Sequence, residues 1–170
     1  CVTEFERWKQ QNKLSTRTAA ENKQLAAKFA VESSLTTDSS ICDFVRNLGV
    51  TAPLTYQNVG SMIAMALIRQ NCDYVDNHFY WNHPTFSPGG NLPAGVEGGS
   101  AIREYIGSRG HLPDVFAARL TDKPYAITEF NFCAPNPYRA EGGALTGAYA
   151  ALQDWDALFR FGYAEAPMQI

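Results

Sequence analysis

The chain has 170 residues, a length that fits one domain with a sizeable core. Hydrophobic residues make up 45% of it and charged residues 18%, so the chain is predicted to fold rather than to stay disordered. Its 14 basic and 17 acidic residues show no Lys/Arg cluster, and no apolar run reaches the roughly 18 residues of a membrane span, which argues against nucleic-acid and membrane partners.

The first part of the chain is predicted to be helical, beginning with a charged, helix-like start. Residues 18–31 carry an apolar face opposite a charged one, which is typical of an amphipathic helix. A second helix is predicted over residues 36–47, with its N-cap among residues 36–38. Gly49 follows directly after Leu48 and is expected to end this helix.

Strands and helices are predicted to alternate in the rest of the chain. The runs with strand character are residues 52–58, 73–81, 124–130 and 156–164. The runs with helix character are residues 61–71, 100–107 and 140–155, whereas residues 114–122 fit a partial helix or a strand. A Pro/Gly-rich loop over residues 83–99 resembles a functional lid. Strands that alternate with helices indicate an α/β fold with a parallel sheet.

Polar and aromatic side chains gather at the predicted carboxyl ends of these strands, where α/β proteins place their sites. They are Gln57 and Asn58, then His78, Tyr80 and Trp81, and finally Glu129 and Asn131. An acid such as Glu129 at the rim of a buried strand costs desolvation free energy unless it is paired or used. It is either a functional group or the partner of a nearby arginine such as Arg139.

Three motifs follow one another along the chain: VDNHFYWNHPTF (75–86), KPYAITEFNFCAPNPYRAE (123–141) and LQDWDALFRFGYA (152–164). In this order they resemble the C-terminal half of a retaining glycoside hydrolase barrel of clan A, the group that includes cellulases, mannanases and β-galactosidases. The stretch FVRNLGVTAPLTYQN (44–58) resembles the helix and fifth strand of the same barrel. The resemblance implies a partial (β/α)8 TIM barrel of about four C-terminal βα units, with residues 1–170 forming a single partial domain.

The resemblance also implies catalytic roles. Glu129 matches the nucleophile that attacks the anomeric carbon of a β-linked glycan and forms a glycosyl-enzyme intermediate. His78 and Tyr80 match the residues that bond the sugar and hold this nucleophile ionised. No cofactor is implied. No metal site is expected either, since the three histidines and four cysteines lack metal-ligand spacing.

Four further residues are expected to bind the carbohydrate substrate. Trp81 would stack on a sugar face, while Gln57 and Asn58 would bond sugar hydroxyls. Asn131, two residues after the predicted nucleophile, joins them.

One carboxyl group of the mechanism is missing. Retaining enzymes need two carboxyl groups about 5–5.5 Å apart, and the family's acid/base Glu follows Asn at the end of the fourth strand. The sequence before residue 52 has no such Asn-Glu pair at a strand end. We therefore expect this chain to be the C-terminal half of a longer enzyme, with a missing N-terminal half-barrel as its partner. Alone it would be inactive and would self-associate through its open sheet edges.

Two other interpretations stay open. A non-catalytic carbohydrate-binding relative of the barrel would keep the aromatic subsites without the second acid. An unrelated α/β enzyme would use the strand-end Glu129 as a general base.

Overall fold

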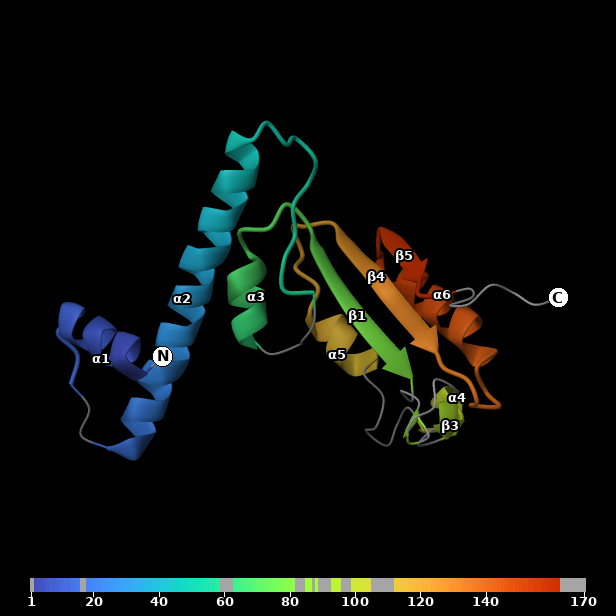
Figure 1. The fold of residues 1–170 in the computed structure, drawn as a ribbon. Coiled ribbons are helices and arrows are strands. Elements are labelled where there is room, and N and C mark those ends of the chain that lie inside the picture. Colours follow the sequence, from blue (N-terminus) through green and yellow to red (C-terminus); the bar gives the residue numbers. More distant parts are fainter. Residues whose placement is uncertain are drawn as a thin grey trace. The chain divides into compact units, whose positions relative to one another are not determined.

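A computed structural model describes residues 2–15, 18–58, 63–81, 85–86, 88, 93–95, 99–104 and 112–162 of the chain (Figure 1). The chain divides into two compact units, Cys1–Ala52 and Pro53–Ile170. The first is helical and the second is a mixed α/β unit. The single partial domain expected over residues 1–170 stays a prediction.

The first unit contains two helices, α1 (Val2–Gln11) and α2 (Ala19–Asn47). The rings of Phe5 and Trp8 on α1 both pack against the ring of Phe29 on α2, with centroids 5.5 and 5.6 Å away. The apolar face predicted for residues 18–31 therefore packs against α1.

The two helices expected over residues 18–31 and 36–47 are one continuous helix, so the predicted break between them is wrong. Its start is confirmed, because Thr18 forms a capping box with Glu21. The predicted second cap fails because the hydroxyl of Thr36 donates to the carbonyl of Glu32, 2.9 Å away, and so bonds within the helix instead of capping a new one. The end at Leu48 and Gly49 is confirmed.

The second unit is built on an open, parallel, three-stranded sheet in the order β1-β4-β5. Its strands are β1 (Val75–Trp81), β4 (Tyr125–Phe132) and β5 (Ala157–Arg160). They confirm three of the four predicted strands and the parallel α/β fold. Within the described residues the sheet is not closed into a barrel.

The other elements of this unit are short except for one helix. They are α3 (Ile63–Arg69), the antiparallel pair β2 (Thr85–Phe86) and β3 (Pro93–Gly95), α4 (Ala101–Glu104), α5 (Leu112–Ala117) and α6 (Glu141–Gln153). The predicted helices at 61–71, 100–107 and 140–155 are confirmed over the described parts, and the undecided segment at 114–122 is helical at its start. Most of the predicted lid at 83–99 lies outside the described residues.

The strand predicted over residues 52–58 is wrong, although the segment lies beside β1 and runs in the same direction. The amide of Asp73 donates to the carbonyl of Leu54, and the amide of His78 donates to the carbonyl of Asn58, both at 2.9 Å. These two bonds lie at opposite ends of the segment, and no continuous ladder joins them to β1.

Side chains and one backbone angle explain why this ladder does not form. Gln57 has a φ of 62°, which is outside the extended region that a strand requires. Its carbonyl instead accepts a hydrogen bond of 2.8 Å from Nε of the buried Arg69. The backbone amide of Leu54 likewise donates to the side chain of Asp73, 2.7 Å away, rather than to a strand carbonyl.

The core lies on the sheet face covered by α5 and α6 (Figure 1). Its buried residues include Val75, Phe79, Trp81, Val115, Tyr125, Ile127, Phe130 and Phe132. Phe79 and Phe130 stack across β1 and β4 with ring centroids 5.6 Å apart. Aromatic pairs of this kind stabilise a sheet by about 0.5–1.5 kcal/mol beyond the burial of their surface.

The hydroxyl of Tyr125 gives the first testable prediction. It donates to the carbonyl of Val115 at 2.6 Å inside the core, and burial raises the pKa of this phenol above its ordinary value. Tyr125→Phe should lower the free energy of unfolding by about 1–2 kcal/mol at neutral pH. Urea denaturation of both proteins measures the difference.

The same pair of proteins should differ in pH dependence. Because the pKa of Tyr125 is raised in the folded state, its stabilising effect is complete below about pH 10 and is lost as pH rises beyond that value. The wild type should therefore lose stability more steeply than Tyr125→Phe above that pH. Parallel curves over the alkaline range would contradict this assignment.

A second prediction concerns the contact between α6 and β4. A methyl group at Gly142 would lie 2.5 Å from Cδ2 of Phe132, whereas one at Gly143 would meet nothing within 4 Å. Gly142→Ala should therefore destabilise the fold by about 1–3 kcal/mol. The matched control Gly143→Ala should be neutral or stabilise it by up to about 1 kcal/mol. Thermal unfolding that ranked the two variants the other way would refute this packing.

Candidate functional site

A β-bulge in β4 builds the candidate site. Ile127 pairs with Asn77 of β1, and Glu129 pairs with His78, so Thr128 is an extra residue on β4. Core residues on this strand accordingly fall at 125, 127, 130 and 132, with one interval of three instead of two. The bulge lets Thr128 and Glu129 lie on the same face of the sheet, the one opposite the core. Bulges next to active sites commonly re-aim a side chain in this way.

Glu129 is held by two side chains of the neighbouring strand. The hydroxyl of Tyr80 donates to Oε1 of Glu129. Nδ1 of His78 lies 3.5 Å from Oε2, an ion-pair distance when the ring is protonated. The side chains of His78 and Glu129 are 21% and 26% exposed, so the group is partly sheltered but reachable from solvent. The expected meeting of Glu129, His78 and Tyr80 at adjacent strands is thus confirmed as geometry.

The described contacts of Glu129 do not include an arginine. The pairing with Arg139 that the sequence left open is not among them, and Arg139 is exposed. The carboxylate is therefore oriented by a phenol and an imidazole rather than neutralised by a guanidinium.

His78 has two further neighbours at its second ring nitrogen. Nε2 lies 3.0 Å from Oγ1 of Thr128 and 3.1 Å from Nδ2 of Asn58. Thr128 in turn donates to Oδ2 of Asp76, which is 4% exposed, at 2.7 Å. Asn58, a predicted substrate-binding residue, is therefore near the site but bonds protein groups there.

Asp76 and Thr128 belong to the site although the sequence analysis did not single them out. The period-two spacing of Asp76, His78 and Tyr80 along β1 is a signal that could have indicated Asp76. Nothing comparable marks Thr128, because a bulge reverses the alternation that a sequence reading assumes.

Trp81 is not brought to this site. It is 1% exposed, stacks on Phe132 with centroids 6.2 Å apart, and its Nε1 donates to the carbonyl of Gly99 at 3.0 Å. Trp81 follows Tyr80 directly, so strand alternation turns it to the core face. A ring buried in this way offers no face to a sugar in this structure.

The described hydrogen bonds of Asn131 and Gln57 do not involve the carboxylate of Glu129. The amide of Asn131 donates to the carbonyl of Phe161 at 3.0 Å, and its oxygen accepts from Nε of Arg160 at 3.2 Å. Asn131 therefore ties β4 to the strand beside it. Gln57 is exposed, and the contact that joins it to α3 uses its backbone carbonyl.

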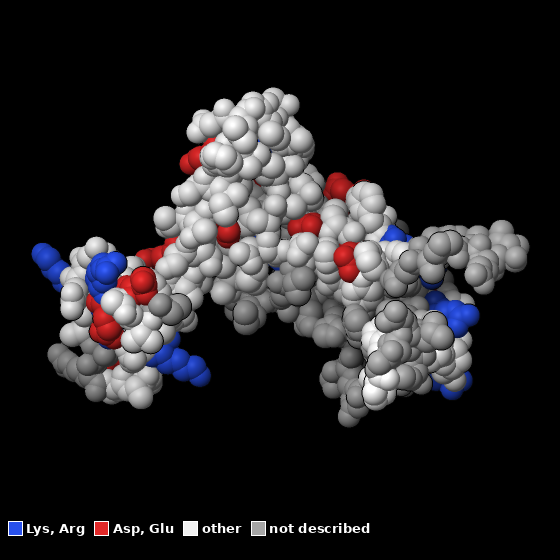
Figure 2. All heavy atoms as spheres, in the orientation of Figure 1, with Lys and Arg blue, Asp and Glu red and all other residues white. Residues whose placement is uncertain are grey.

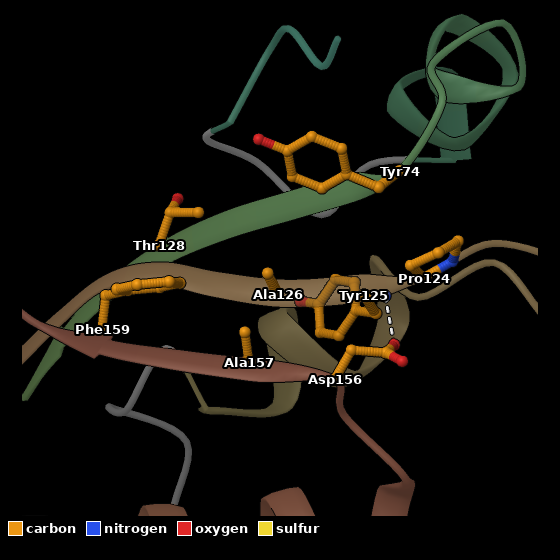
Figure 3. A pocket seen from close by; sticks show the side chains of 8 residues that line it. All are labelled: Tyr74, Pro124, Tyr125, Ala126, Thr128, Asp156, Ala157 and Phe159. Atoms are coloured by element: carbon orange, nitrogen blue, oxygen red, sulfur yellow. Dashed lines mark hydrogen bonds between the residues drawn. The ribbon is translucent and has the colours of Figure 1, made fainter. Parts of the chain in front are cut away.

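A pocket of about 510 Å³ lies on the sheet at the amino-terminal side of this site (Figure 3). Its lining comes from all three strands and the residues before them: Tyr74, Pro124, Tyr125, Ala126, Thr128, Asp156, Ala157 and Phe159. Thr128 and Phe159 point from the strands to the side opposite α6 in Figure 3. The pocket is thus largely apolar yet open to solvent, and Phe159 is 57% exposed.

The described charged residues on the face drawn in Figure 2 show no concentration that would suggest a polyanionic ligand. On the face drawn in Figure 2, the described Lys and Arg side chains are scattered and do not join into one patch. The expectation that nucleic acid is not a partner stays a prediction.

No metal centre is found among the described residues of the site. Within the described ranges, no group of three or more His, Cys, Asp or Glu residues is placed to hold a metal ion. The described helices include none long and apolar enough to cross a membrane.

Comparisons with known protein families, curated proteins and solved structures find no match to this chain.

Proposed function

We propose that this chain is the C-terminal half of a retaining glycoside hydrolase that cleaves β-linked glycans, with Glu129 as the nucleophile. The observation that carries the proposal is the carboxylate of Glu129 held by Tyr80 and His78 across two parallel strands. A double displacement needs an ionised, aimed carboxylate at the carboxyl-terminal side of such a sheet.

The contacts of Glu129 suit this task. A phenol that donates to Oε1 and an imidazole nitrogen beside Oε2 both fix the orientation of the carboxylate. The partial exposure of Glu129 leaves room for a sugar carbon to approach. The polar atoms of His78 and Tyr80 mainly contact the carboxylate of Glu129. These two residues would therefore contact the substrate only through the ring edges that are exposed to solvent.

Strand order supports a partial barrel. Residues 53–58 run beside β1, and β4 and β5 follow in chain order, so each parallel segment neighbours the next one in the sequence. A (β/α)8 barrel has this order, whereas doubly wound sheets reverse it at a switch point. The apolar face that carries the pocket would then become the barrel interior, closed by an N-terminal half-barrel that also supplies the acid/base carboxyl group.

A mechanism-based probe tests the proposal. A 2-deoxy-2-fluoroglycoside with a good leaving group, applied to the full-length enzyme, should trap a glycosyl ester on Glu129, because the fluorine slows the second displacement more than the labelling step. Peptide mass spectrometry locates the label. Hydrolysis of unlabelled substrate without labelling at Glu129, or labelling on another carboxylate, would overturn the assigned role.

The open face and edge lead to a further prediction for the chain by itself. The outer edge of β5 and the apolar pocket would both lack cover, so we expect the 170-residue chain alone to self-associate. Sedimentation velocity should show concentration-dependent species larger than one chain. A single monomeric species at all concentrations would count against the half-barrel.

A non-catalytic glycan-binding protein is the second candidate. It is favoured by the fact that the described contacts of Glu129 include no second carboxyl group. A full-length protein that binds oligosaccharides in calorimetry, yet neither hydrolyses them nor takes up the probe, would select this candidate. Turnover without any sugar specificity would instead favour an α/β enzyme that uses Glu129 as a general base.

A further inference from the structure

We propose that Asp76, acting through the hydroxyl of Thr128, holds a proton on Nε2 of His78 and so makes Nδ1 the ring nitrogen that shares a proton with Glu129. Asp76 and Thr128 are then positioning residues, since neither touches Glu129 in a described contact. The inference rests on the proposed function for its catalytic meaning. The protonation of the ring, by contrast, is a property of this chain that can be measured without a substrate.

The first step concerns the direction of the hydrogen bonds at Asp76. Its Oδ1 lies 3.0 Å from the hydroxyl of Thr55, and its Oδ2 lies 2.7 Å from that of Thr128. A carboxylate can only accept, so both hydroxyl hydrogens point at Asp76. These two bonds also offset the desolvation cost of an acid that is only 4% exposed.

The second step follows from the single hydrogen of a hydroxyl group. Because Thr128 gives its hydrogen to Asp76, its oxygen can only accept from Nε2 of His78, 3.0 Å away. Nε2 must therefore carry a proton. Asn58 lies 3.1 Å from the same nitrogen, but its amide can present either an oxygen or an NH2 group. The amide of Asn58 can therefore adapt to either protonation state of Nε2 and does not determine which one is present.

The third step concerns the other nitrogen. With Nε2 protonated, a neutral ring would turn the lone pair of Nδ1 toward Oε2 of Glu129, 3.5 Å away, and the two lone pairs would repel. One proton is therefore retained between Nδ1 and Oε2, where it links His78 to Glu129.

Few charged groups among the described residues lie around His78 and Asp76. The described titratable groups that face this arrangement are Glu129 at Nδ1, the phenol of Tyr80 on Glu129, and Asp76 behind Thr128. The buried guanidinium of Arg69 on α3 and the phenols of Tyr74 and Tyr125 interact electrostatically with Asp76. Asp76 is the last group in this series of hydrogen bonds, and its carboxylate orients the Thr128 hydroxyl.

Nitrogen NMR of the imidazole ring tests the inference. In the 170-residue chain labelled with [15N]histidine, Nε2 of His78 should be protonated at a pH of about 8, where an ordinary imidazole is neutral. Thr128→Val removes the acceptor, so Nδ1 should donate to Glu129 while Nε2 accepts from Asn58. The unprotonated fraction of Nε2 should rise about fivefold or more, the effect of losing one hydrogen bond.

Two further variants separate this role from a loss of structure. Thr128→Ser keeps the hydroxyl and should keep the proton on Nε2. Asp76→Asn lets the Thr128 hydroxyl turn toward the ring and should shift the proton in the same direction as Thr128→Val. Magic-angle spinning gives these shifts for associated as well as monomeric protein. His78→Gln identifies the signal among the three histidines.

An unprotonated Nε2 in the wild type, or equal protonation in Thr128→Val and Thr128→Ser, would overturn the inference. The wild-type spectrum keeps this test decisive even where a variant fails to fold. Failure of the fluoroglycoside to label Glu129 would overturn the proposed function and leave the ring measurement unaffected, so the two outcomes are distinguishable.

Discussion

Glu129→Gln in the proposed full-length glycosidase should lose turnover by a factor on the order of 10⁴–10⁶, the scale seen when a catalytic nucleophile is removed. The amide is nearly the same size as the acid but cannot attack the anomeric carbon. Its oxygen can still accept from Tyr80, so the strand pairing around it should persist. Sugar binding, measured by calorimetry, should therefore change little. Steady-state kinetics on an aryl β-glycoside give the loss of turnover.

Asp154→Asn is the matched control for this change. It also converts a carboxylate to an amide, but the side chain of Asp154 is fully exposed at the end of α6. It should keep normal turnover. Normal turnover in Glu129→Gln would show that another residue is the nucleophile, and loss of both turnover and binding would indicate that the substitution disturbs the fold instead.

Tyr80→Phe should lower turnover about 10- to 100-fold, the second largest effect we expect. The change removes the hydrogen bond to Oε1 of Glu129 but keeps the ring, which packs against Phe161 with centroids 6.3 Å apart. A hydrogen bond to a charged group is worth about 1.5–3 kcal/mol, which corresponds to this range of rates. The loss should appear in kcat, because the bond positions the nucleophile.

Tyr138→Phe provides the comparison, since Tyr138 lies at an exposed position on the loop before α6. It loses the same hydroxyl group and should keep full turnover. A Tyr80→Phe enzyme with unchanged kcat would mean that Tyr80 does not orient Glu129 during the reaction. A fall in thermal stability alone, without a kinetic change, would assign Tyr80 a structural role.

Local sequence patterns predict much of the α/β unit. The apolar runs around 73–81 and 124–130 are short and β-branched or aromatic, and they form β1 and β4 as expected. The position of Glu129 near the carboxyl end of its strand, with His78 and Tyr80 on the neighbouring strand, also follows from these runs. Parallel strands bring their carboxyl ends to one edge, so these three residues are expected near one another, but the face on which Glu129 lies depends on the bulge.

Other expectations failed where distant groups compete for the backbone. Residues 52–58 have the composition of a strand, yet the side chains of Arg69 and Asp73 bind backbone groups that a ladder would use. The hydroxyl of Thr36 bonds inside α2 and removes the break predicted there. Trp81 has the chemistry of a sugar platform, but strand alternation places it in the core. None of these outcomes can be read from residue type alone, because each depends on which group the side chain bonds in the folded chain or on which face is buried.

Residue order and hydrophobic pattern are therefore enough to establish a parallel α/β unit and to bring an acid, a phenol and an imidazole to neighbouring strands. How those groups are aimed depends on contacts between residues as far apart as Tyr80 and Glu129, 49 positions away, and on a bulge that reverses the alternation at Thr128. A bulge forms where two particular strands pair, so it arises only from the folded arrangement, as does the burial of Asp76 that orders the hydroxyl behind His78.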